Sequence, residues 1–224
     1  MATYTIKPGD YVAKIAFLHG FRSYQTIYDD PANADFRSKR PNPDVLFPGE
    51  TLIIPDKQDH DEAADTGKKH TFFARPRTPV KLRLIVKGHD FTPLADKRYT
   101  LTLGRETIGE DGKARTGKDG LIEHDIDPSI TQARLKVFLD DSDPDRGPAW
   151  KLLIGDLDPI TEISGVKGRL NNLGFDCGQV NGTFDDPLRK ALAAFREAMS
   201  IPAPADDSAV DDPTRDRLQK EHDS

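Results

Sequence analysis

Apolar residues recur at helical spacing near the start of the chain, directly after the turn Pro8-Gly9-Asp10. They are Val12, Ile15, Ala16 and Leu18. Short β-type segments flank this helix at Thr3–Ile6 and Thr51–Ile54, and a second helix is expected over Tyr24–Tyr28. The predicted order β-α-α-β places a small α+β module at residues 1–56.

Between residues 71 and 157, apolar and polar residues alternate as they do in strands that bury one face. The clearest runs are Val80–Val86, Tyr99–Leu103 and Leu135–Leu139, and glycine-marked turns lie between them. This pattern predicts a small antiparallel β-sandwich at residues 71–157.

From residue 158 to residue 224 the spacing of apolar residues is helical again. Pro187 and Pro213 fit the first turns of two of the expected helices. The apolar positions of all three helices are Val166, Leu170, Leu173, Leu188, Leu192, Phe195 and Leu218. We therefore predict a three-helix module at residues 158–224, and a multidomain α+β protein as a whole.

The segment Asp56–His70 separates the first two modules. It reads DKQDHDEAADTGKKH, with one glycine and no large apolar residue. Such a segment has nothing to bury, so we predict a charged linker at residues 57–70.

Composition agrees with several small modules rather than one large domain. Charged residues make up 31% of the 224 residues and apolar types 36%, and the mean hydropathy is −0.63. The formal net charge is −6, which argues against nucleic acid or an anionic membrane surface as the main partner. The N-terminal residues lack a signal-peptide pattern, and no apolar run is long enough to insert into a membrane. We expect synthesis in the cytoplasm, with action there in a complex or, after delivery by another route, in the periplasm or cell wall.

The first module begins with YTIKPGD and ends with LFPGETLIIP. Together these motifs resemble the lysin-motif (LysM) domain, which implies a shallow groove that binds N-acetylglucosamine-containing glycans. The groove would lie between the loop before the first helix and the loop before the last strand. Carried over, its residues are Gly9, Asp10, Tyr11, Val12, Asn42, Val45, Leu46 and Phe47.

Several of these residues have a second interpretation. Val12, Leu46 and Phe47 also suit a core, and Asp10 suits an N-cap. Tyr11 stands where the family usually has threonine, and we expect its ring to be exposed against the C–H face of a sugar. On this hypothesis Tyr11→Ala weakens glycan binding and leaves the melting temperature nearly unchanged.

The middle module contains the phrase GKARTGKDGLIEHDI, which resembles transthyretin-like, immunoglobulin-like modules. The resemblance implies a spacer or docking face. The run Glu123-His124-Asp125 invites an acid–base or metal-site interpretation, but neighbours on a strand point to opposite faces. We therefore expect an ordinary solvated strand there.

The last module carries RLNNLGF and VNGTF, and it resembles the peptidoglycan-binding domain of wall hydrolases. Its candidate wall-binding residues are Arg169, Phe175, Asn181 and Phe184. The sequence departs from the family where Asn181 replaces the common aspartate, Leu188 a threonine and Arg196 a glutamine.

No catalytic constellation is recognisable. The single thiol, Cys177, has no histidine nearby in sequence, and the six histidines have no metal-ligand spacing. All three modules are assigned, which leaves no further domain for a pair of catalytic carboxylates. We expect no catalytic residue, no metal and no cofactor.

Two functional hypotheses remain. The first is a non-catalytic peptidoglycan-recognition or adaptor protein, because the module order resembles accessory proteins of contractile injection machines such as type VI secretion systems and phage tails. The second is a protein–protein adaptor in a spike or effector complex that reuses wall-binding folds without binding sugar. The basic run Arg37–Arg40 favours the second.

Overall fold

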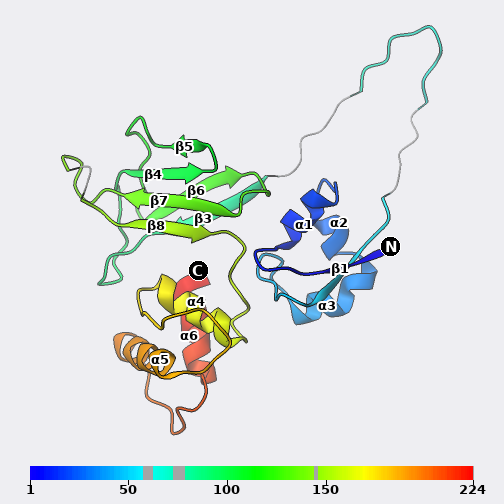
Figure 1. Cartoon of the computed structure of the whole chain (residues 1–224). Coiled ribbons are helices and arrows are strands. Elements are labelled where there is room, and N and C mark those ends of the chain that lie inside the picture. Colours follow the sequence, from blue (N-terminus) through cyan, green and yellow to red (C-terminus); the bar gives the residue numbers. More distant parts are fainter. Residues whose placement is uncertain (58–62, 73–78, 144–145, 224) are drawn as a thin grey trace. The chain divides into compact units, whose positions relative to one another are not determined.

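The computed structural model describes residues 1–57, 63–72, 79–143 and 146–223 (Figure 1). The chain is mixed α+β, with helices and small antiparallel sheets, as predicted. It divides into two compact units, Met1–Asp44 with Pro48–Gly155 and Val45–Phe47 with Asp156–Ser224. The finer division into three modules stays a prediction, and part of the expected linker lies outside the described residues.

A two-stranded antiparallel sheet organises the N-terminal part of the first unit. In it β1 (Ala2–Thr5) pairs with β2 (Thr51–Ile54). The intervening elements are α1 (Val12–Leu18), α2 (Gln25–Tyr28), the 3-10 turn η1 (Pro31–Asn33) and α3 (Ala34–Lys39). The connection between α2 and β2, which contains the basic run Arg37–Arg40, is thus partly helical.

The extra helical stretch has local causes. Asp30 accepts a hydrogen bond from the Ala32 amide at 2.8 Å, and Pro31 occupies the first turn of η1. Asn33 is buried, and its amide nitrogen donates to the carbonyls of Ile27 and Ile53, each at 2.8 Å. Asn33 therefore ties this connection to β2.

Two antiparallel sheets form the rest of the first unit. The first pairs β3 (Val80–Ile85) with β6 (Leu121–Ile126). The second has the order β5 (Glu106–Ile108), β4 (Tyr99–Leu103), β7 (Gln132–Val137) and β8 (Ala149–Leu153). Both sheets contribute to one hydrophobic cluster of Val86, Tyr99, Leu101, Leu103, Ile122, Ile126, Ala133, Leu135 and Val137. The strand alternation predicted for residues 80–85 is confirmed by alternating burial.

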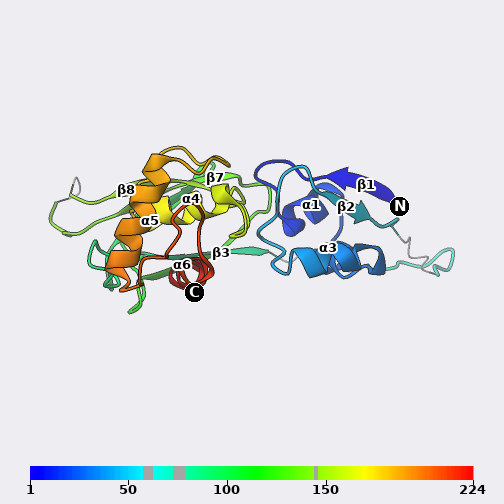
Figure 2. The ribbon, with the colours of Figure 1, turned by 90° about the horizontal axis from the view of Figure 1, so that it is seen from below.

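The second unit contains α4 (Ile163–Asn172), α5 (Asp186–Ala198) and α6 (Asp212–Asp223). Figures 1 and 2 together show that α5 runs across the direction of α6. The helices enclose a core of Val166, Leu170, Cys177, Leu188, Ala191, Leu192, Phe195, Val210 and Leu218. The three expected helices are therefore present.

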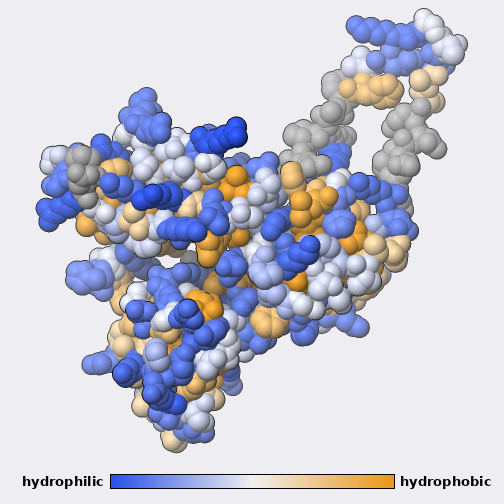
Figure 3. Space-filling view, in the orientation of Figure 1, coloured by the Kyte–Doolittle hydropathy of each residue, from blue (hydrophilic) through white to orange (hydrophobic). Residues whose placement is uncertain are grey.

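Most of the surface in Figure 3 is hydrophilic, and hydrophobic side chains gather over α1. Leu18, the last residue of α1, is exposed. Within the described ranges, no helix has the length and apolarity that crossing a membrane requires.

Candidate functional site

The candidate groove begins at the turn between β1 and α1. Gly9 has a φ of +76°, a left-handed conformation that glycine adopts without strain. Asp10 is buried, and its carboxylate accepts hydrogen bonds from the Tyr4 hydroxyl at 2.8 Å and the Lys7 amide at 2.9 Å. Lys14 Nζ lies 3.1 Å from the other carboxylate oxygen. Asp10 therefore holds the turn closed, and the expected N-cap role is wrong, because Tyr11 occupies the N-cap position of α1.

A second stretch of backbone lies beside this turn. The Val12 amide donates to the Pro43 carbonyl at 2.9 Å, and Lys14 Nζ donates to the Gly9 carbonyl at 2.7 Å. Asn42, next to Pro43, is exposed, and its side-chain oxygen accepts a hydrogen bond from the Asp44 amide at 2.9 Å. The structure thus places the start of α1, directly after the Gly9 turn, beside the loop that contains Asn42.

Tyr11 does not expose its ring. The side chain is 3% exposed, and its hydroxyl donates to the Pro128 carbonyl at 3.0 Å. Burial, with nearby Asp44 and Asp127, raises the pKa of Tyr11 to about 12. The expectation of an exposed sugar platform is wrong here, because a large ring that finds both an apolar site and a hydrogen-bond acceptor is more stable inside.

The other apolar groove residues divide between two environments. Val12 is fully buried and Leu46 is 3% exposed, so both behave as core residues. Val45 and Phe47 are half-buried. Of the eight residues that the resemblance assigned to a groove, Gly9, Asn42, Val45 and Phe47 therefore retain access to solvent.

Arg169, the first candidate of the helical module, points inward. It is 1% exposed, and its guanidinium donates to Asp223 at 3.0 Å and to the carbonyls of Asp158 at 2.9 Å and Gly165 at 3.0 Å. Because Arg169 is buried and these hydrogen-bond partners belong to its own unit, its side chain is not exposed for the wall contact that the resemblance implied.

Asn181 belongs to a polar cluster that the sequence did not reveal. Its side-chain oxygen accepts from Lys167 Nζ at 2.9 Å, and Lys167 also pairs with Asp185 at 2.7 Å. Lys167 is completely buried, so these acceptors replace the water that its ammonium group has lost. Its position beside the apolar stripe of α4 was the only sequence signal.

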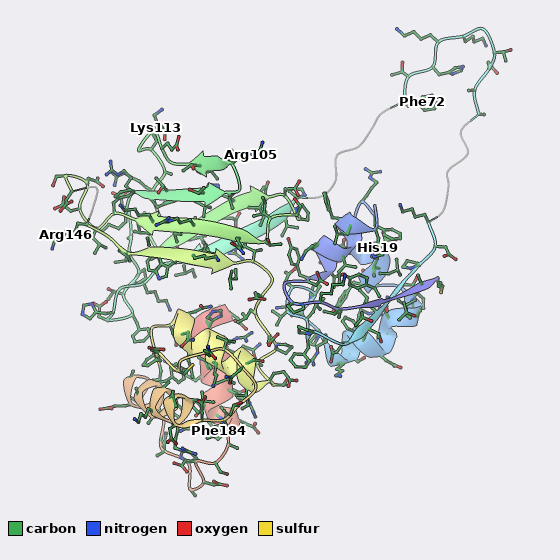
Figure 4. The ribbon with its side chains drawn as sticks, in the orientation of Figure 1. His19, Phe72, Arg105, Lys113, Arg146 and Phe184 are labelled. Atoms are coloured by element: carbon green, nitrogen blue, oxygen red, sulfur yellow. The ribbon has the colours of Figure 1, made fainter. Side chains whose placement is uncertain are left out.

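The two phenylalanines differ in surroundings. Phe175 is half-buried and packs edge-on against Phe195, with ring centroids 5.4 Å apart. Phe184, labelled in Figure 4, precedes α5 and lies under the Arg189 guanidinium at 5.4 Å. Val180, in the same loop, is 51% exposed. The loop of Val180 and Phe184 is therefore the more accessible part of the second candidate surface.

The remaining reactive side chains have structural partners. Cys177 is buried, and burial raises the pKa of its thiol, which disfavours the nucleophilic thiolate. Glu123 and Asp125 pair with Lys81, whereas His124 Nε2 lies 2.7 Å from the Tyr99 hydroxyl. In the parts of the chain that the structure describes, no three histidine, cysteine, aspartate or glutamate side chains converge as metal ligands would.

No family model, curated protein sequence or solved structure matches this chain.

Proposed function

We propose that this chain is a non-catalytic protein that recognises N-acetylglucosamine-containing glycans of peptidoglycan and acts as an adaptor of a contractile injection apparatus. One observation carries the proposal. The two motifs of the LysM resemblance, which are far apart in sequence, lie side by side: β1 pairs with β2, the Ile6 amide donates to the Glu50 carbonyl at 2.8 Å, and the Gly49 amide donates to the Ile6 carbonyl at 2.9 Å.

The geometry of the turn supports recognition of an uncharged ligand. Asp10 fixes the loop of Gly9 through Tyr4, Lys7 and Lys14, so the loop does not have to be ordered when a ligand binds. The carboxylate of Asp10 is neutralised by Lys14 inside the fold. Asn42 then offers an exposed amide, a group that suits sugar hydroxyl and acetamido groups.

A protein-adaptor function is the second candidate. The inward positions of Tyr11 and Arg169 favour it, because each removes a large side chain that the resemblance assigned to wall contact. In this alternative the same folds dock onto a spike or effector protein.

Asn42→Asp tests the glycan site. The aspartate keeps the acceptor for the Asp44 amide but removes the amide donor that faces solvent. Loss of one ligand hydrogen bond corresponds to a factor of about three to ten in affinity. We expect that loss in titrations with N-acetylglucosamine oligomers, and an unchanged melting temperature.

Gln25→Glu is the matched control, because it makes the same amide-to-carboxylate change at an exposed position on α2. It should bind like the wild type. If the wild type does not bind at millimolar oligomer, the glycan proposal fails. Co-purification of a spike or effector protein would then support the adaptor function.

A further inference from the structure

The outer face of the four-stranded sheet carries a cluster of cations. Arg134 on β7 lies directly opposite Lys151 on β8, and Lys136 follows on the same face of β7. Across β4, Thr102 and Thr100 are the register partners of Arg134 and Lys136. Arg134 and Lys151 are exposed and Lys136 is half-buried. We call Arg134, Lys136 and Lys151 the basic face.

This arrangement does not stabilise the fold. Like charges directly opposite each other on neighbouring strands are destabilising. None of the three cations forms an ion pair with a carboxylate in the described part of the chain. Lys136 Nζ instead lies 5.3 Å from the centroid of the Phe138 ring. Arg134 and Lys151 therefore break a local rule of sheet pairing without a compensating carboxylate, which indicates a role outside the fold.

The other outer face of the same strand-rich part provides the contrast. There, Lys81 lies opposite Asp125 and Arg83 opposite Glu123. Lys81 Nζ is 3.0 Å from Glu123 and 3.3 Å from Asp125, and Arg83 is 3.0 Å from Glu123. One face therefore neutralises its cations within the sheet, and the basic face does not.

The basic face is a local feature rather than a consequence of overall charge. Residues 156–224 contain fourteen acidic and eight basic residues, so they account for the whole formal net charge of −6. Residues 1–155 are formally neutral. Three uncompensated cations on one face of a neutral segment select for an anionic ligand.

We propose that the basic face binds the carboxylates of the peptide stems of peptidoglycan. This inference rests on the proposed function, because that function makes the wall polymer the ligand. Arg134 presents a planar fork that matches a carboxylate, Lys136 and Lys151 add point charges, and Thr100 and Thr102 add hydroxyl groups. A neutral glycan site and a carboxylate site on one polymer raise each other's effective concentration.

The test compares two double variants with the same charge change. Arg134→Gln/Lys151→Gln removes two cations of the basic face, and Lys81→Gln/Arg83→Gln removes two from the neutralised face. The ligands are purified sacculi and a soluble disaccharide-peptide, each used with free and with amidated carboxylates. Exposed charge pairs contribute a factor of about two to five each. We expect the first variant to bind the free-carboxylate ligands about fivefold to tenfold more weakly, and the second to bind like the wild type.

Amidation of the ligand should weaken its binding to the wild type about as much as the first double variant does. It should not weaken binding to the first double variant any further. If the two double variants bind alike, or if amidation changes nothing, the inference is overturned. It is also overturned if the first variant loses only low-salt self-association in sedimentation, because the partner is then a second copy of the chain. Titration with uncharged N-acetylglucosamine oligomers separates the two proposals. If these oligomers do not bind, the glycan site is contradicted, whereas carboxylate binding by the basic face is not.

Discussion

At the scale of single residues, Tyr11 is held by both its ring and its hydroxyl. The ring passes so close to Gly155 that an added Cβ there would lie 2.6 Å from Tyr11 Cδ1. The hydroxyl donates to the Pro128 carbonyl. Removal of the hydroxyl leaves a carbonyl without its partner, and removal of the ring leaves a cavity, so the two changes differ in cost.

We predict that Tyr11→Phe lowers the free energy of unfolding by about 1 kcal/mol. Tyr11→Ala should lower it by about 3–4 kcal/mol, because a large buried side chain is lost. Urea unfolding followed by circular dichroism measures both values. An unchanged stability of Tyr11→Ala would show that the ring is exposed, as the glycan-platform hypothesis required.

At the scale of elements, three buried cations join the helices of the second unit. Lys167 of α4 pairs with Asp185 at the N-cap of α5, and Arg169 of α4 pairs with Asp223 at the end of α6. Arg196 of α5 pairs at 2.6 Å with Asp211, next to the start of α6. Every pair of helices is thus connected by one ion pair as well as by apolar packing.

Asp223→Asn tests the link between α4 and α6. It leaves Arg169 buried without its anion, and we expect the free energy of unfolding to fall by about 1–3 kcal/mol, discounted because Asp223 is partly exposed. Asp216→Asn is the matched control, since Asp216 is an exposed aspartate on the same helix. Equal stabilities of the two variants in urea unfolding would contradict the role of the Arg169–Asp223 pair.

The same ion pairs predict an acid-sensitive unit. The Lys167 hydrogen bond holds the pKa of Asp185 below its ordinary value. Burial raises the pKa values of Asp211 and Asp223, but hydrogen bonds outweigh burial, so both pKa values are lowered. Asp211 accepts hydrogen bonds from Thr214 and Arg196. Asp223 accepts them from His222 and Arg169. A lowered folded-state pKa contributes stability above the unfolded pKa of about 3.9, and this stability is lost as pH falls through the lowered values.

Amide hydrogen exchange across α4, α5 and α6 measures this loss. Protection should be constant from about pH 7 to pH 5, after correction for the intrinsic exchange rate, and should fall below about pH 4. Constant corrected protection down to about pH 2.5 would contradict the stabilising role of the three pairs.

Elements with a local signal were predictable from the sequence, and contacts between distant residues were not. The alternation over residues 80–85 predicted β3, and the stripe of Val166 and Leu170 predicted α4. The burial of Tyr11 depends on Pro128, which is far away in sequence. The basic face depends on the register of β7 with β8, and alternation alone does not determine register.

At the scale of the whole molecule, the charged segment at residues 56–70 is where we expect a protease to cut the chain first. It contains Lys57, Lys68 and Lys69 and no large apolar residue. We predict that limited trypsin digestion cleaves first at these lysines and releases a folded N-terminal fragment. Mass spectrometry identifies the site, and a first cleavage inside a predicted module would contradict the three-module division.

Binding to intact sacculi at high salt separates glycan recognition from charge-dependent binding. About 0.5 M salt screens exposed charges, so the contribution of the basic face is suppressed and the neutral glycan site remains. We predict that the full chain co-sediments with sacculi under these conditions and that N-acetylglucosamine oligomers displace it. No co-sedimentation, or binding that millimolar oligomer does not displace, would contradict glycan recognition by this chain.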